Sequence, residues 1–200
     1  MQAISSINRV KYGLFLKRSS LSIPAKLLMV VAMAGLTGLL AQVRIPLPFT
    51  PVPVTGQVLA MLMAGVVLGR WWGGASMAVY AAAGMAGLPW FAGFTSGLGA
   101  TGGYILGFIP AALFLGHFVD KYVESRRLIP MMGLMLAATL IYYIPGAAWL
   151  ALWFKSAGMA VSFTGVIMAG VAPFILIDII KAVVAGLISF AIVPKQDYSA

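Results

Sequence analysis

The sequence predicts an all-α integral membrane protein, a six-transmembrane-helix bundle with both ends of the chain in the cytoplasm. Of its 200 residues, 62% are hydrophobic and only 8% are charged, against roughly 45–50% and about 25% in a soluble domain. A hydrocarbon core of about 30 Å takes about 20 helical residues per crossing. The chain therefore has room for at most six or seven spans with short loops, and for no sizeable soluble domain.

The apolar runs divide the chain into three parts: a basic N-terminal segment at 1–26, a transmembrane domain at 27–193 and a short tail at 194–200. Within the domain, spans are predicted at 27–43, at 55–68, from there to about residue 88, at 104–119, at 128–154 with a kink or end near Pro145, and at 164–193. Prolines at 46, 48, 51 and 53 make 44–54 a stiff, extended loop, because proline lacks the backbone donor of a regular helix.

The distribution of basic residues gives the orientation. Ten of the thirteen Lys and Arg residues fall on the side of the N-terminus, only Arg44 and Lys155 fall on the other side, and Lys181 lies inside the last span. The positive-inside rule then places both termini in the cytoplasm and the loops 44–54 and 89–103 outside. The net charge of +9 is thus typical of a multi-pass membrane protein and does not indicate nucleic acid as a partner.

Several functions are excluded by composition. There is no cysteine, hence no disulfide and no thiolate metal site, and acid–base chemistry has one histidine and four acids to draw on. His117 has no ligand-type neighbour in the sequence, so no chemical role is predicted for it. No metal, no cofactor and no enzymatic activity are predicted, and the absence of GxxxxGK[ST] assigns any ATP-driven step to a partner ATPase.

Asp178 and Lys181 lie near the middle of the last predicted span. A charged side chain at that depth is unfavourable by about 2.5–3.5 kcal/mol and requires a partner or a water-filled cavity. A spacing of three places both on one helical face, where they can pair. The pair is therefore the first candidate for contact with a polar ligand, and the alternative is a buried ion pair that only fixes helix packing.

The two outer loops would cover the end of the bundle and form a lid. Proline stiffens the first, and the glycines of the second let backbone approach a ligand. Trp90 and Phe91 can pack a flat or apolar ligand, although anchoring at the membrane interface explains them as well. In the first span, Ala34 and Gly38 are four apart and allow a partner helix to approach closely, or else a helix of the chain's own bundle.

Four segments carry a resemblance to a known family: IPLPFTPVPVTGQ at 45–57, GLPWFAG at 87–93, TGGYILGF at 101–108 and DIIKAVVAG at 178–186. Together they resemble BioY, the biotin-binding S components of energy-coupling factor (ECF) transporters. The resemblance runs from the first helix to the last. In three places the sequence departs from the family pattern: Ala100 alone separates SGLG from TGGY, Gly93 stands where some relatives have asparagine, and Ile177 precedes the acid where glycine is frequent.

The resemblance implies high-affinity biotin binding near the outer face of a prokaryotic plasma membrane, in a protein embedded in membrane lipid. It implies two partners, a transmembrane coupling protein, contacted through Ala34 and Gly38, and a pair of cytoplasmic ATPases. The ureido ring and the valerate of biotin offer donors and acceptors to both Asp178 and Lys181, and which meets which end stays open. The implied biotin-binding residues are Thr50, Gln57, Tyr80, Trp90, Phe91, Gly93, Tyr104, Asp178 and Lys181.

Two other classes are alternatives. A secondary transporter or channel for another small solute fits the bundle and the intramembrane pair, but no clear inverted repeat and no further membrane acids for ion coupling are evident. A small intramembrane enzyme would need a nucleophile with a base or a set of metal ligands, and no Ser, His and Asp fall at one membrane depth.

Overall fold

The structure is a computed structural model that describes residues 2–195, so the predicted tail lies outside the described residues from residue 196 on. Helices dominate it, and five of them are long and apolar enough to cross a membrane: 23–42, 57–85, 102–121, 128–156 and the broken segment 163–192. The elements are α1 Gln2–Ser20, α2 Ile23–Gln42, β1 Arg44–Ile45, β2 Val54–Thr55, α3 Gln57–Met85, α4 Gly102–Lys121, η1 Val123–Arg126, α5 Leu128–Ser156, α6 Phe163–Gly170, η2 Ala172–Phe174 and α7 Ile175–Ile192.

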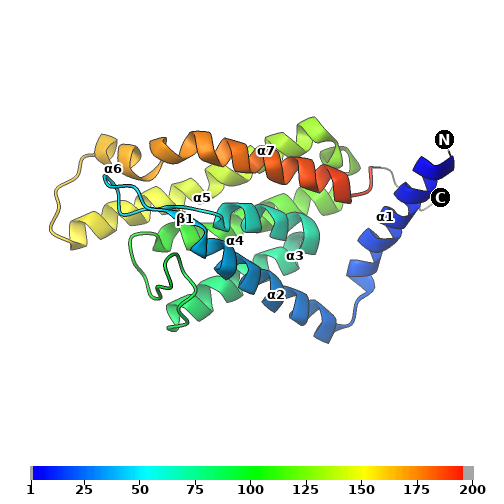
Figure 1. The fold of residues 1–200 in the computed structure, drawn as a ribbon, viewed down its shortest axis with the longest axis horizontal. Helices are drawn as coiled ribbons and strands as arrows, with labels where there is room; N and C mark the ends of the chain where they lie inside the picture. Colours follow the sequence, from blue (N-terminus) through cyan, green and yellow to red (C-terminus); the bar gives the residue numbers. More distant parts are fainter. Residues whose placement is uncertain (1, 196–200) are drawn as a thin grey trace.

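The helices pack in a bundle whose central layer is α3, α4 and α5 in that order, with α2 against α3 and with α7 against α5 and α3. Figure 1 shows that the two ends of the helix bundle carry different elements. One end, called here the loop end, carries β1, β2, α6 and the loop 86–101. The other, called the α1 end, carries α1 and η1. Of the basic segment predicted at 1–26, residues 2–20 form α1, and the residues from Ile23 on form the first turn of α2.

The second and third predicted spans are the two arms of α3. The backbone of Gly69 is non-helical, with φ at 79°, and beyond it the chain turns back on itself. A Cβ on Gly73 would lie 2.7 Å from the carbonyl oxygen of Ala64, an approach that a straight helix does not allow between residues nine apart. One helical segment therefore supplies two antiparallel arms.

Two charged side chains hold this turn at the α1 end. The Asp120 carboxylate, near the end of α4, accepts the backbone N–H of Arg70 at 2.8 Å and so caps the start of the second arm. It also forms an ion pair with Arg18 of α1, whose guanidinium donates to the carbonyl of Val66 at 2.8 Å. Backbone polar groups at the ends of both arms thus form hydrogen bonds with side chains from other helices.

We expect Gly69→Ala to destabilise the protein more than Gly97→Ala, measured as the thermal unfolding midpoint in detergent. Both glycines have a left-handed φ, 79° and 81°, which is unfavourable for alanine by about 1–2 kcal/mol. At Gly69 the new Cβ would also lie 2.7 Å from an Asp120 carboxylate oxygen, whereas at Gly97 nothing lies within 4 Å. Equal losses would show that Asp120 does not lock the turn.

The sixth predicted span differs from its prediction, because it is broken between Gly170 and Ile175 into α6, η2 and α7. Pro173 lies in the break, and proline cannot donate the backbone hydrogen bond of a continuous helix. The break turns Asp178 from a mid-span residue into one in the first turn of α7, where the helix dipole favours a carboxylate. The fifth span shows no end at Pro145, since α5 runs through it.

Gln42, the last residue of α2, holds the loop 86–101 against the end of α2. Its side-chain oxygen accepts the backbone N–H groups of Gly93 at 3.1 Å and Phe94 at 3.0 Å, and its amide donates to the carbonyl of Phe91 at 3.1 Å. Two residues later β1 begins, and it pairs with β2 in an antiparallel ladder, Arg44 opposite Thr55. The proline loop between the strands is therefore fixed at its base.

Candidate functional site

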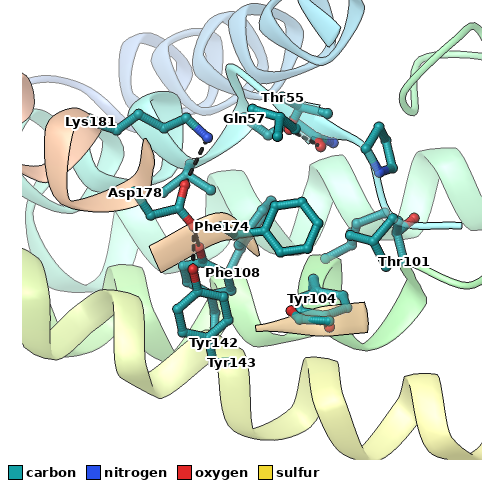
Figure 2. A pocket seen from close by; sticks show the side chains of 16 residues that line it. Thr55, Gln57, Thr101, Tyr104, Phe108, Tyr142, Tyr143, Phe174, Asp178 and Lys181 are labelled. Carbon is teal, nitrogen blue, oxygen red and sulfur yellow. Dashed lines mark hydrogen bonds and ion pairs between the residues drawn. The ribbon is translucent and has the colours of Figure 1, made fainter. Parts of the chain in front are cut away.

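A pocket lies where the proline loop, α4, α5 and the broken segment meet (Figure 2). Its two ends differ: Asp178, Lys181, Tyr142 and Tyr143 gather at one, Thr101 lies at the other, and rings of Phe108 and Phe174 lie between them. The lining residues are Val52, Pro53, Val54, Thr55, Gln57, Val58, Thr101, Tyr104, Ile105, Phe108, Tyr142, Tyr143, Gly170, Phe174, Asp178 and Lys181.

Asp178 is the centre of a buried polar cluster and is only 2% exposed. One carboxylate oxygen accepts from the Lys181 ammonium at 2.8 Å, and the other accepts from the hydroxyls of Tyr142 and, at 2.6 Å, Tyr143. The carboxylate is thus engaged through both oxygens. Lys181 has two further N–H donors, which makes its ammonium the cluster's main group for binding an acceptor on a ligand.

Gln57 supplies a second polar position. Its side-chain oxygen accepts the hydroxyl of Thr55 at 2.8 Å, and its amide donates to the hydroxyl of Tyr80. Tyr80 is fully buried, and the rings of Trp90 and Phe91 pack on its ring with centroids 5.2 and 5.3 Å away. The aromatic group therefore lies behind Gln57 and fixes its side chain.

Two hydroxyls fasten the broken segment over the pocket. The Tyr104 hydroxyl donates to the carbonyl of Gly170 at 2.8 Å, and the Thr50 hydroxyl, at the tip of the proline loop, donates to the carbonyl of Ala169 at 2.7 Å. The last carbonyls of α6 have no partner within that helix because the helix stops. The proline loop, α6 and α4 are thus held together around the pocket.

Comparison with known proteins identifies the family. Residues 15–197 match the sequence profile of the BioY family. The chain belongs to the BioY family. The resemblance seen in the four motifs is therefore confirmed, and the family is one of transporters rather than enzymes, as the sequence predicts.

The relatives are prokaryotic membrane transporters. A probable biotin transporter BioY from Methanothermobacter thermautotrophicus is 48% identical over 142 residues, which are 68% of this chain and 90% of that protein. The biotin transporter BioY from Thermotoga maritima is 36% identical over 149 residues, which are 72% of this chain and 83% of that protein. The crystal structure of the S-component for biotin from an ECF-type ABC transporter superposes with a TM-score of 0.74 at 26% identity, covering 88% of this chain and 96% of that one. The fold is that of an ECF S-component.

In this BioY protein, the structure brings some of the predicted site residues together and not others. Asp178, Lys181, Gln57 and Tyr104 line the pocket. Thr50 and Phe91 line a wider hollow beside it. The other three line neither cavity: Tyr80 and Trp90 support Gln57 from behind, and Gly93 lies beneath the guanidinium of Arg44.

Ala34 and Gly38, which the sequence predicts to contact a partner helix, are both buried within the chain's own bundle. Ala34 is fully buried beside Tyr80 and Phe91. A Cβ on Gly38 would lie 3.1 Å from the Cβ of Trp90. The small residues therefore let the loop 86–101 approach α2, which is the alternative that the sequence left open.

Sequence reasoning missed the pair Tyr142 and Tyr143. Both lie in the middle of α5, and their hydroxyls complete the coordination of Asp178. A hydroxyl at that depth requires a partner, since the hydrocarbon core has no water to offer one. Two adjacent tyrosines in mid-span were thus the available signal.

Proposed function

We propose that this BioY family member binds biotin in the pocket at the loop end and serves as the S component of an ECF transporter. One observation carries the proposal: a buried, paired Asp178 and Lys181 face a cavity with aromatic walls, within a family whose members are named biotin transporters. An intramembrane ion pair at a cavity is expected to serve a ligand.

The loop end faces the outside in this proposal. Basic residues gather at the α1 end, where Arg18, Arg70, Lys121, Arg126 and Arg127 lie. The positive-inside rule assigns that end to the cytoplasm. With α2, the two arms of α3, α4, α5 and the α6–α7 segment as six crossings, both chain ends are cytoplasmic and the pocket opens outward.

The lining suits the chemistry of biotin. The bicyclic ring is compact and mostly apolar outside its ureido group, so the rings of Phe108 and Phe174 can pack it. Ureido and carboxylate groups are strong hydrogen-bonding partners for Lys181 and Gln57. Because the sequence lacks a phosphate-binding loop, the energy for uptake comes from partner ATPases joined through a coupling protein.

We expect the purified chain to bind biotin tightly and with one-to-one stoichiometry in non-ionic detergent, measured by isothermal titration, and to hydrolyse no ATP. Thiamine and riboflavin serve as control ligands of similar size and should give no heat of binding. Preference for either control vitamin, or no binding of any of the three, would contradict the proposal.

A further inference from the structure

The link between α1 and α2 restricts where α1 can lie. α2 has 20 residues, about the number that one crossing requires, so its first residue lies at the edge of the hydrocarbon core. Only residues 21 and 22 separate it from the end of α1, and this link reaches at most about 11 Å. α1 is not among the described helices that are apolar enough to cross a membrane, and it runs across the α1 end at a steep angle to the bundle (Figure 1). α1 therefore lies along the membrane surface.

Two side chains fasten the last turns of α1 to the bundle. The Arg18 guanidinium pairs with Asp120 and donates to the carbonyl of Val66 at 2.8 Å. Phe15 packs against the hydrophobic core, and the guanidinium carbons of Arg18 and Arg126 lie 3.7 and 4.4 Å from the centroid of its ring. These contacts fix the orientation of α1 against the bundle.

The other cations of α1 are not neutralised by any described residue. Arg9, Lys11 and Lys17 form no ion pair with residues 2–195, and residues 1–26 contain no Asp or Glu. The apolar side chain of Val10 is 62% exposed. Successive helical residues are about 100° apart, so Arg9 and Lys11 flank Val10 on its two sides, and Lys17, one heptad later, shares the face of Val10.

From this position and charge we infer that α1 binds the headgroups of anionic phospholipids, with its three unneutralised cations on the phosphates and Val10 among the upper acyl carbons. Exposed cations around an apolar side chain are the chemistry by which a surface helix binds an anionic leaflet. Residues 2–14 precede the part of the chain that matches the BioY profile, so most of this surface lies outside what the family shares. It also contributes no residue to the pocket.

The experiment uses the full-length chain, which contains no cysteine, so that Val10→Cys gives a single attachment site for a spin label. The labelled protein is placed in nanodiscs of phosphatidylcholine, alone or mixed with phosphatidylglycerol. Accessibility to oxygen and to a water-soluble nickel complex gives the ratio of membrane-bound to water-exposed label. This ratio should be higher with phosphatidylglycerol, and the difference should disappear at about 1 M salt, where the Debye length is about 3 Å.

Neutral variants of the labelled protein test the cations. One cation near an anionic surface contributes about fivefold to binding, so Lys17→Gln should lower the ratio with phosphatidylglycerol about fivefold. The triple variant Arg9→Gln, Lys11→Gln and Lys17→Gln should lower it about a hundredfold. Lys155→Gln is the matched control, since it removes an exposed cation in the last turn of α5, at the loop end, and it should leave the ratio unchanged. Unchanged thermal unfolding midpoints report that the variants are folded.

Three outcomes would overturn the inference. The label could be equally exposed to water in both lipids, or it could be equally immersed in both, which would leave no role for the anionic headgroup. It could also become shielded only when a coupling protein and ATPases are added, which would make α1 a protein contact. Loss of biotin binding with the lipid dependence intact would overturn the proposed function alone.

Discussion

Asp178→Asn should weaken biotin binding by roughly ten- to a hundredfold and destabilise the folded protein. The substitution leaves the Lys181 ammonium without its counter-ion and turns an acceptor of three hydrogen bonds into a neutral amide. Removing one partner of a buried pair is unfavourable by about 3–5 kcal/mol, and a lost charged contact by about 1.5–3 kcal/mol. Titration calorimetry and thermal unfolding in the same detergent measure the two effects separately.

The double variant Asp178→Asn with Lys181→Met separates a ligand-binding role from a purely structural one. Asp178→Asn alone leaves the Lys181 ammonium unpaired, whereas the double variant has no buried charge at either position. Its unfolding midpoint should therefore recover toward that of the wild type. Biotin affinity should stay low, because no ammonium remains to meet the ligand. A double variant with near-native affinity would show that the pair only fixes helix packing.

Local features of the fold could be predicted from the sequence. The pairing of Asp178 with Lys181 depends on a spacing of three within one helix, and the turn between the two arms of α3 is marked by glycine and Arg70 after an apolar run. Proline at four positions excludes helix from the loop after α2. Each of these depends on neighbours in the chain, which a sequence displays directly.

Features that depend on distant residues could not be predicted in the same way. α2 is apolar on nearly every face, so its pattern does not tell which face turns inward, and the burial of Ala34 and Gly38 against other parts of the chain could not be predicted from it. Tyr142 lies 36 residues before Asp178 in the chain, and its contact is created only when α7 packs on α5. The break at Pro173 was not predicted, because the segments on both sides of it, α6 and α7, are similarly apolar.

The double variant Tyr142→Phe with Tyr143→Phe should lose more stability and more biotin affinity than the two single variants together. Both hydroxyls donate to the same oxygen of Asp178, so one remaining donor still stabilises that oxygen. When both are removed, a buried carboxylate oxygen is left without a hydrogen-bond donor, which is unfavourable by about 1.5–3 kcal/mol. Each single variant should lose about 1 kcal/mol of unfolding free energy or less, and the double variant about 3 kcal/mol.

Affinity should follow because Asp178 holds the Lys181 ammonium in place, so we expect the double variant to bind biotin about tenfold more weakly and each single variant within about threefold of the wild type. Tyr122→Phe is the control: Tyr122 is 43% exposed, and its hydroxyl makes no hydrogen bond within the described part of the chain. Strictly additive losses would mean that the two hydroxyls act independently. The remaining hydroxyl would then not compensate for the loss of the other, which would contradict the prediction that either donor alone is enough to hold the Asp178 carboxylate against Lys181.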